Sequence, residues 1–108
     1  MLLFTDRHLV PEGELKRLIM RGVCRMFPIH AAPTIKVENA LILCDVDLEN
    51  FASARMLRLA LAVHRAPDSP LVFLLRDRTH HTESQARALG ASDMLSVDEG
   101  FNAALRHL

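Results

Sequence analysis

Short continuous apolar runs recur along the chain, separated by polar segments and by stretches with helical periodicity. They lie at residues 2–5, 40–45, 70–76 and, more weakly, 92–97. Apolar runs of this kind, bounded by turn-forming residues, are typical of strands that are buried on both faces. The pattern therefore predicts a sheet that is covered by helices on both sides.

Amphipathic helices are predicted between and after these runs. Apolar residues return at helical spacing over residues 14–27, 49–66 and 82–89, and again from Ser96 onward. Strands that alternate with helices imply parallel pairing through right-handed crossovers. Residues 28–39 contain two prolines and fit neither pattern, so the second strand of the sheet is left unplaced.

Capping residues mark the expected ends of two of these helices. Asp47 or Asn50 is suited to cap the second helix, because short polar side chains accept the free N–H groups of a first turn. Thr82 and Gln85 have the spacing of a capping box at the start of the third helix. Gly90 stands where that helix is expected to end in the left-handed conformation.

The composition is that of one ordinary globular domain. The chain has 108 residues, of which 50% are hydrophobic, and a formal net charge of zero. Its basic residues are dispersed, which argues against binding to nucleic acid. No apolar run approaches the ~20 residues of a membrane span. Cys24 and Cys44 lack the spacing of a disulfide framework or a metal site, so we expect a cytoplasmic protein without membrane contact.

Aspartates stand after two of the predicted strands. Asp45 and Asp47 end the run at 40–45, and Asp6 comes directly after the run at 2–5. Open parallel sheets collect functional groups at the carboxyl ends of their strands, so Asp6 and Asp45 are expected on one rim. There they form a phosphorylation or metal site, or they only satisfy nearby backbone N–H groups. The second interpretation is favoured for Asp45, and a helix cap is favoured for Asp47.

Other reactive residues show no recognisable site. Cys44 continues a buried run without a neighbouring histidine, which favours an inert thiol. His80 and His81 are adjacent, point in different directions and lack a third ligand, which favours a solvated loop over a metal site. Gly-rich phosphate loops and the common hydrolase and zinc-protease motifs do not occur. No enzyme activity, metal or cofactor is predicted.

Three stretches, LILCDVDL, PLVFLLR and ARALGASDMLSV, resemble the corresponding parts of response-regulator receiver domains. The resemblance covers nearly the whole chain. It implies a flavodoxin-like, three-layer α/β/α sandwich with a mostly parallel five-stranded sheet, as a single receiver-like domain over residues 1–108. It also implies that Asp45 occupies the position of the phosphoacceptor, and Asp6 that of one metal-binding acid.

Departures from the receiver pattern affect the groups that carry its chemistry. Arg7 stands where the family usually has a second acid, and Leu75 where it has Thr or Ser. Val97 and Asp98 replace the usual Lys and Pro after the fifth strand. Mg²⁺ requires carboxylate oxygens, and the missing lysine and hydroxyl would contact the phosphoryl group. We therefore interpret the chain as a degenerate receiver, or pseudo-receiver.

A salt-bridged pocket is expected in place of a metal site. Asp6, Asp45 and Asp47 form the residual acidic pocket, and Arg7 and Arg76 are predicted near the same rim. Either arginine could pair with Asp6 or Asp45. Such a pair would occupy the place that a metal ion would take.

The region before Ala40 is too short for the full receiver pattern. Only about a dozen residues separate Phe27 from Ala40, whereas a parallel crossover alone needs about that many. The second helix is therefore expected to be shortened or missing, which would expose one flank of the helix at 49–66. Leu57 and Leu61 lie on that flank and are the predicted interface residues, since exposed apolar patches mark partner surfaces.

Three hypotheses describe the function. The leading one is a non-catalytic signalling module that acts through protein contact, either as a homodimer or by controlling an attached output domain. The chain would then be the N-terminal module of a longer bacterial signalling protein. The first alternative is a phosphorylatable two-component receiver that uses Asp45 and Mg²⁺. The second is a sensor of a small anion or nucleotide at the rim formed by Asp6, Arg7, Asp45, Arg76 and Arg78.

Overall fold

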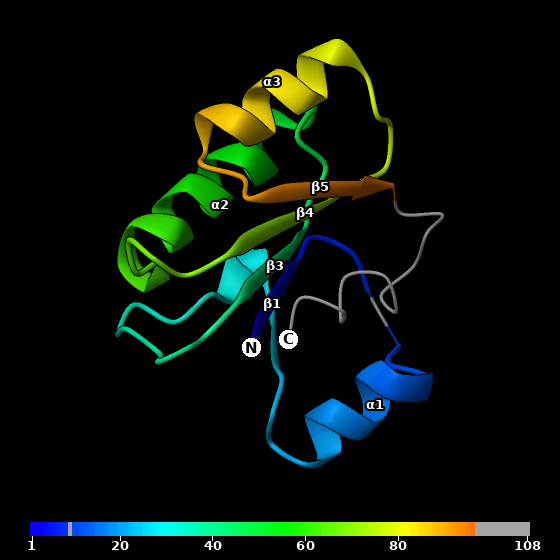
Figure 1. Ribbon diagram of the computed structural model, residues 1–108, viewed down its shortest axis with the longest axis vertical. Coiled ribbons are helices and arrows are strands. Elements are labelled where there is room, and N and C mark those ends of the chain that lie inside the picture. Colours follow the sequence, from blue (N-terminus) through cyan, green and yellow to red (C-terminus); the bar gives the residue numbers. More distant parts are fainter. Residues whose placement is uncertain (9, 97–108) are drawn as a thin grey trace.

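Strands and helices alternate through the part of the chain that the computed structural model describes, residues 1–8 and 10–96 (Figure 1). The strands are β1 (Leu2–Thr5), β2 (Arg25–Pro28), β3 (Ile42–Asp45), β4 (Leu71–Leu75) and β5 (Asp93–Ser96). The α-helices are α1 (Gly13–Met20), α2 (Phe51–His64) and α3 (His80–Ala88), and the 3₁₀ helix η1 (Ile29–Ala31) comes directly after β2.

The five strands form one sheet in the order β2-β1-β3-β4-β5, and every pair is parallel. This confirms the predicted α/β class, and the strand order is that of a flavodoxin-like fold. The chain moves from β1 to one side of the sheet and then returns to continue on the other side. The reversal lies between β1 and β3, so a crevice is expected at the carboxyl ends of these two strands.

Helices cover both faces of the sheet, as the continuous apolar strands require. Figure 1 shows α2 and α3 on one side of the sheet and α1 on the other. Along β3, Ile42 and Cys44 pack in the core beneath α2 and α3. Leu43, between them, packs with Leu15 and Leu18 of α1. Because successive strand residues point to opposite faces, a sheet covered twice needs apolar residues at every position.

The helix predicted over residues 14–27 is too long. Its last residues belong to β2, the second strand that the sequence left unplaced. After α1 the chain turns at Gly22, whose φ of 76° is the left-handed conformation that glycine adopts without strain. The N–H groups of Val23 and Cys24 both donate to the carbonyl of Leu18, at 2.9 and 3.1 Å. This closes the helix, and Arg25–Pro28 then runs parallel to β1 as an edge strand of the sheet.

A buried histidine anchors the connection from β2 to β3. This connection contains η1 and no α-helix. His64 of α2 is 0% exposed. Its Nε2–H donates to the carbonyl of Pro33 at 2.8 Å, and its Nδ1 accepts the N–H of Val37 at 3.1 Å. The side-chain amide of Asn39 also donates to the His64 carbonyl, at 3.0 Å. The irregular segment 33–39 is thereby held against α2.

The face of α2 that packs on the core differs from the predicted one. Leu57 is 0% exposed and Leu61 is 7% exposed, so their assignment to an exposed partner surface is wrong. Leu59 of the same helix is 61% exposed. The reason is that Leu57 and Leu61 lie on the side of α2 that packs in the core with the strands, whereas Leu59 lies at the surface beside Pro33 and Thr34.

The third helix begins earlier than predicted. Thr79 is its N-cap, and its hydroxyl accepts the N–H of Thr82 at 3.1 Å while the Thr82 hydroxyl accepts the N–H of Thr79 at 3.0 Å. The capping box is therefore formed by Thr79 with Thr82, not by Thr82 with Gln85. Gly90 stands after the helix with a φ of 96°, which confirms the predicted end.

Two sequence predictions concern residues beyond β5. Ser96 ends β5, and the helix predicted from this residue onward lies outside the described residues, as do Val97 and Asp98. Within residues 1–8 and 10–96, no helix is long and apolar enough to cross a membrane.

Asn50 is the residue that caps α2, and its loss is expected to lower the free energy of unfolding by about 1 kcal/mol. Its side-chain oxygen accepts the N–H of Ser53 at 3.1 Å. Urea denaturation of Asn50→Ala would measure the effect. Asn50→Ser is the matched control, because serine accepts the same N–H group and should preserve stability. Equal losses in both variants would contradict the capping role.

Candidate functional site

The polar residues predicted at the rim come together where β1 and β3 end. Thr5 and Asp45 are register partners at the carboxyl ends of these adjacent strands. Asp6 and Arg7 come directly after β1, and Arg76 comes directly after β4 on the other side of β3. These five residues, named here the aspartate pocket, lie at the crevice that the strand order predicts.

Asp45 is the buried centre of the aspartate pocket. Its side chain is 0% exposed. One carboxylate oxygen, Oδ2, accepts hydrogen bonds from Arg7 Nε at 2.7 Å and from the Thr5 hydroxyl at 2.9 Å. The other, Oδ1, lies 3.6 Å from Arg76 Nη2, within ion-pair distance, and accepts no hydrogen bond among the described residues. Two cations thus compensate the one buried charge.

Asp6 links Arg76 to the loop after β3. Arg76 Nη2 donates to Asp6 Oδ1 and to the backbone carbonyl of Asp45, the second at 3.2 Å. Asp6 Oδ2 accepts the N–H of Asp47 at 2.8 Å. Burial alone would lower the pKa of the Arg76 guanidinium, but the hydrogen bond to Asp6 and the nearby carboxylate charges raise it. Arg76 therefore remains a cation that bridges two strand ends.

The predicted roles of Asp45, as an acceptor for backbone N–H groups, and of Asp47, as a helix cap, are taken by other residues. Asp45 binds side chains, and Asp6 is the aspartate that satisfies a backbone N–H of the loop after β3. Asp47 accepts the N–H of Glu49 at 3.0 Å and so closes a local turn, whereas Asn50 caps α2. Asp47 therefore neither caps the helix nor makes an ion pair with the described residues.

A divalent cation does not fit the aspartate pocket as it stands. Mg²⁺ takes several oxygen ligands in near-ideal octahedral geometry. Here the two acids, Asp6 and Asp45, already hold the guanidinium groups of Arg7 and Arg76, and the four formal charges cancel. In the part of the chain that the structure describes, no group of three or more His, Cys, Asp or Glu residues is arranged to hold a metal.

Thr5 was missed by sequence reasoning, although a signal was present. It is the one polar residue of β1 and ends that strand, so register alone would place its hydroxyl next to Asp45. Leu75 ends β4 and is 2% exposed, so it presents an apolar side chain at the strand end where the receiver pattern has a hydroxyl.

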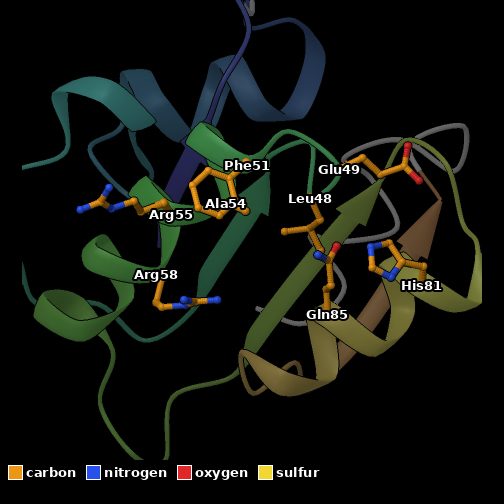
Figure 2. A pocket seen from close by; sticks show the side chains of 8 residues that line it. All are labelled: Leu48, Glu49, Phe51, Ala54, Arg55, Arg58, His81 and Gln85. Atoms are coloured by element: carbon orange, nitrogen blue, oxygen red, sulfur yellow. The ribbon is translucent and has the colours of Figure 1, made fainter.

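The cysteines and histidines are not part of the aspartate pocket. Cys24 and Cys44 are buried free thiols, and burial raises the pKa of both, which makes them poor nucleophiles. His80 and His81 were expected on a loop, but they are exposed residues of the first turn of α3. His81 instead lines a groove between α2 and α3 (Figure 2).

Comparison with known proteins gives no match: no family model, no curated protein and no solved structure matches the chain. The geometry of the aspartate pocket and the fold therefore carry the functional argument.

Proposed function

We propose that this chain is a non-catalytic signalling module of the pseudo-receiver type, in which two arginines close the pocket around the central aspartate. The observation that carries the proposal is the contact of Arg7 and Arg76 with opposite oxygens of the buried Asp45 carboxylate. The module would work in the bacterial cytoplasm through contact with another protein domain, either a second copy of the chain or an attached output domain.

The contacts of Asp45 argue against phosphoryl transfer. An attacking carboxylate oxygen must reach the phosphorus in line with the leaving group, and the charge that develops must be stabilised by positioned donors or cations. Asp45 Oδ2 is engaged by Thr5 and Arg7, and Oδ1 is buried beneath Arg76. Transfer to Asp45 would require these ion pairs to open first.

The fold and the resemblance support the signalling class. The strand order β2-β1-β3-β4-β5 is the one that the resemblance to receiver domains implies, and Asp45 ends β3 as a phosphoacceptor would. Since the same position is neutralised by ion pairs, the scaffold would keep the architecture of a receiver and lose its phosphorylation chemistry. Protein contact is then the remaining means of passing a signal.

The first test is an amide NMR spectrum recorded with and without Mg²⁺ and beryllofluoride, which mimics a phosphoryl group on an aspartate. We expect no change at Asp6, Asp45 or Arg76, because the guanidinium groups occupy the space between the acids. Saturable shifts centred on these residues would contradict the proposal and favour the phosphorylatable alternative.

Arg7→Asp is the matched control for this experiment. The substitution removes one guanidinium and adds a carboxylate beside Asp6 and Asp45, which would bring together the oxygen ligands that Mg²⁺ prefers. We expect this variant to show Mg²⁺-dependent shifts that the natural chain does not show.

A further inference from the structure

A second polar site lies outside the aspartate pocket, in a groove between α2 and α3. The groove has a volume of about 640 Å³ and is bordered by the loop between β3 and α2. This volume falls within the range of about 300–1,000 Å³ that is typical of small-molecule sites. Figure 2 shows the side chains that line it, which come from that loop and from the first and middle turns of both helices.

The groove carries the positive charge of Arg58, which makes no ion pair with the described residues. Arg58 extends from α2 toward Gln85 of α3, and His81 faces the groove from α3 (Figure 2). Arg55 also borders the groove, but its guanidinium group points away from Gln85 and His81 (Figure 2). Neither arginine makes an ion pair with the residues that the structure describes. Glu49 is the single acid among the described lining residues, and its carboxylate points away from Arg58.

Two further side chains of the groove, Gln85 and Phe51, bear on what it could bind. The side-chain oxygen of Gln85 is buried and accepts no hydrogen bond within residues 1–8 and 10–96. An unsatisfied buried acceptor is costly, which makes a ligand donor favourable there. Phe51 is 82% exposed at the start of α2, so an aromatic face lies open beside the arginines. Leu48 and Ala54 provide apolar surface between these groups.

We propose that this groove binds a free mononucleotide. A phosphate group would be held by Arg58 and His81, since guanidinium groups bind phosphate oxygens by charge-assisted hydrogen bonds. The base would stack on Phe51, as bases do on exposed aromatic side chains. Gln85 Oε1 has no donor among the described residues, and a turn of this side chain toward the groove would let it accept from a base amino group or a ribose hydroxyl. The proposal uses none of the residues of the aspartate pocket and is independent of whether that pocket is closed.

NMR titration of the isotopically labelled full chain with AMP and GMP tests this proposal, with inorganic phosphate and adenosine as separate probes. We expect saturable shifts at Phe51, Arg58 and Gln85 with at least one nucleotide. Phosphate alone and adenosine alone should each bind at least about tenfold more weakly, because each keeps only part of the contact set.

Variants of exposed residues assign the contacts. Arg58→Gln should weaken nucleotide binding about tenfold, and Phe51→Ala should weaken it several-fold. Both side chains are exposed, so both variants should retain the spectrum of a folded protein. Arg21→Gln is the matched control, because Arg21 is an exposed arginine at the end of α1, on the other side of the sheet. It should leave binding unchanged.

Three results would overturn the proposal. They are the absence of shifts at the groove with both nucleotides, equal affinity for phosphate and nucleotide, and an Arg58→Gln variant that binds like the natural chain. The Arg7→Asp variant distinguishes a failure of this proposal from a failure of the proposed function. It changes the aspartate pocket and should leave nucleotide binding intact, so each proposal can fail without the other.

Discussion

Replacing Arg7 and Arg76 together by glutamine is expected to lower the free energy of unfolding by about 3–5 kcal/mol, as is typical when a buried charge loses its partners. The Asp45 carboxylate is 0% exposed, and these two arginines supply its cationic contacts. With both removed, the described contacts of that carboxylate would reduce to the Thr5 hydroxyl. Urea denaturation of the double variant would measure the loss.

The effect of Asp45→Asn should reverse its sign between the two backgrounds. In the natural chain the substitution removes the negative charge that two ion pairs share and should cost about 2 kcal/mol. In the Arg7→Gln, Arg76→Gln chain it removes an uncompensated buried charge and should recover about 1–2 kcal/mol. Arg21→Gln, at an exposed position outside the pocket, should change stability by less than about 0.5 kcal/mol.

A loss of stability on Asp45→Asn in both backgrounds would contradict the ion-pair account. It would show instead that the Asp45 carboxylate depends chiefly on uncharged donors such as Thr5. Arg7 and Arg76 would then contribute little to the stability of the buried carboxylate, and the proposal that they close the pocket would lose its energetic basis.

His64→Ala is expected to lower the free energy of unfolding by about 3 kcal/mol. The substitution leaves a cavity in a fully buried site and removes two hydrogen bonds, to Pro33 and Val37. The loss should be concentrated in the connection between β2 and β3. Hydrogen exchange at Val37 should therefore rise far more than exchange at Leu43 in the central strand β3.

His30→Ala is the matched control for the histidine experiment. His30 lies on η1, in the same connection, but its side chain is exposed. Its removal should change stability by less than about 0.5 kcal/mol. If both variants lost the same amount, or if His64→Ala left exchange at Val37 unaltered, the anchoring role of His64 would be wrong.

In the aspartate pocket, arginine side chains take the place that a metal ion could occupy beside two carboxylates. A guanidinium group beside a carboxylate compensates its charge as a metal ion would. It does so by donating hydrogen bonds, whereas a metal ion coordinates oxygen ligands. Arg7 and Arg76 satisfy Asp45 and Asp6 from within the chain. In the proposed function, such a pocket would stabilise the protein and leave signalling to its surfaces.

Elements with a strong local pattern could be predicted without a structure. Runs such as 40–45 and 70–76 are apolar at nearly every position, and a strand covered on both faces accepts that pattern, so β3 and β4 could be predicted. Because parallel strands end at a common rim, the meeting of Asp6, Asp45, Arg7 and Arg76 could be predicted from topology. The ion pairs predicted between these acids and arginines are present in the structure.

The tertiary structure decided whatever the local pattern left ambiguous. Val23 and Met26 fit the apolar face of a longer helix as well as they fit a turn and an edge strand, and only pairing with β1 settles β2 as a strand. The rotation of α2, which buries Leu57 and exposes Leu59, depends on how the helix packs against the strands of the sheet. The partners of His64, and the groove between α2 and α3, likewise arise from residues far apart in sequence. Periodicity describes one segment at a time, whereas these features depend on which segments meet.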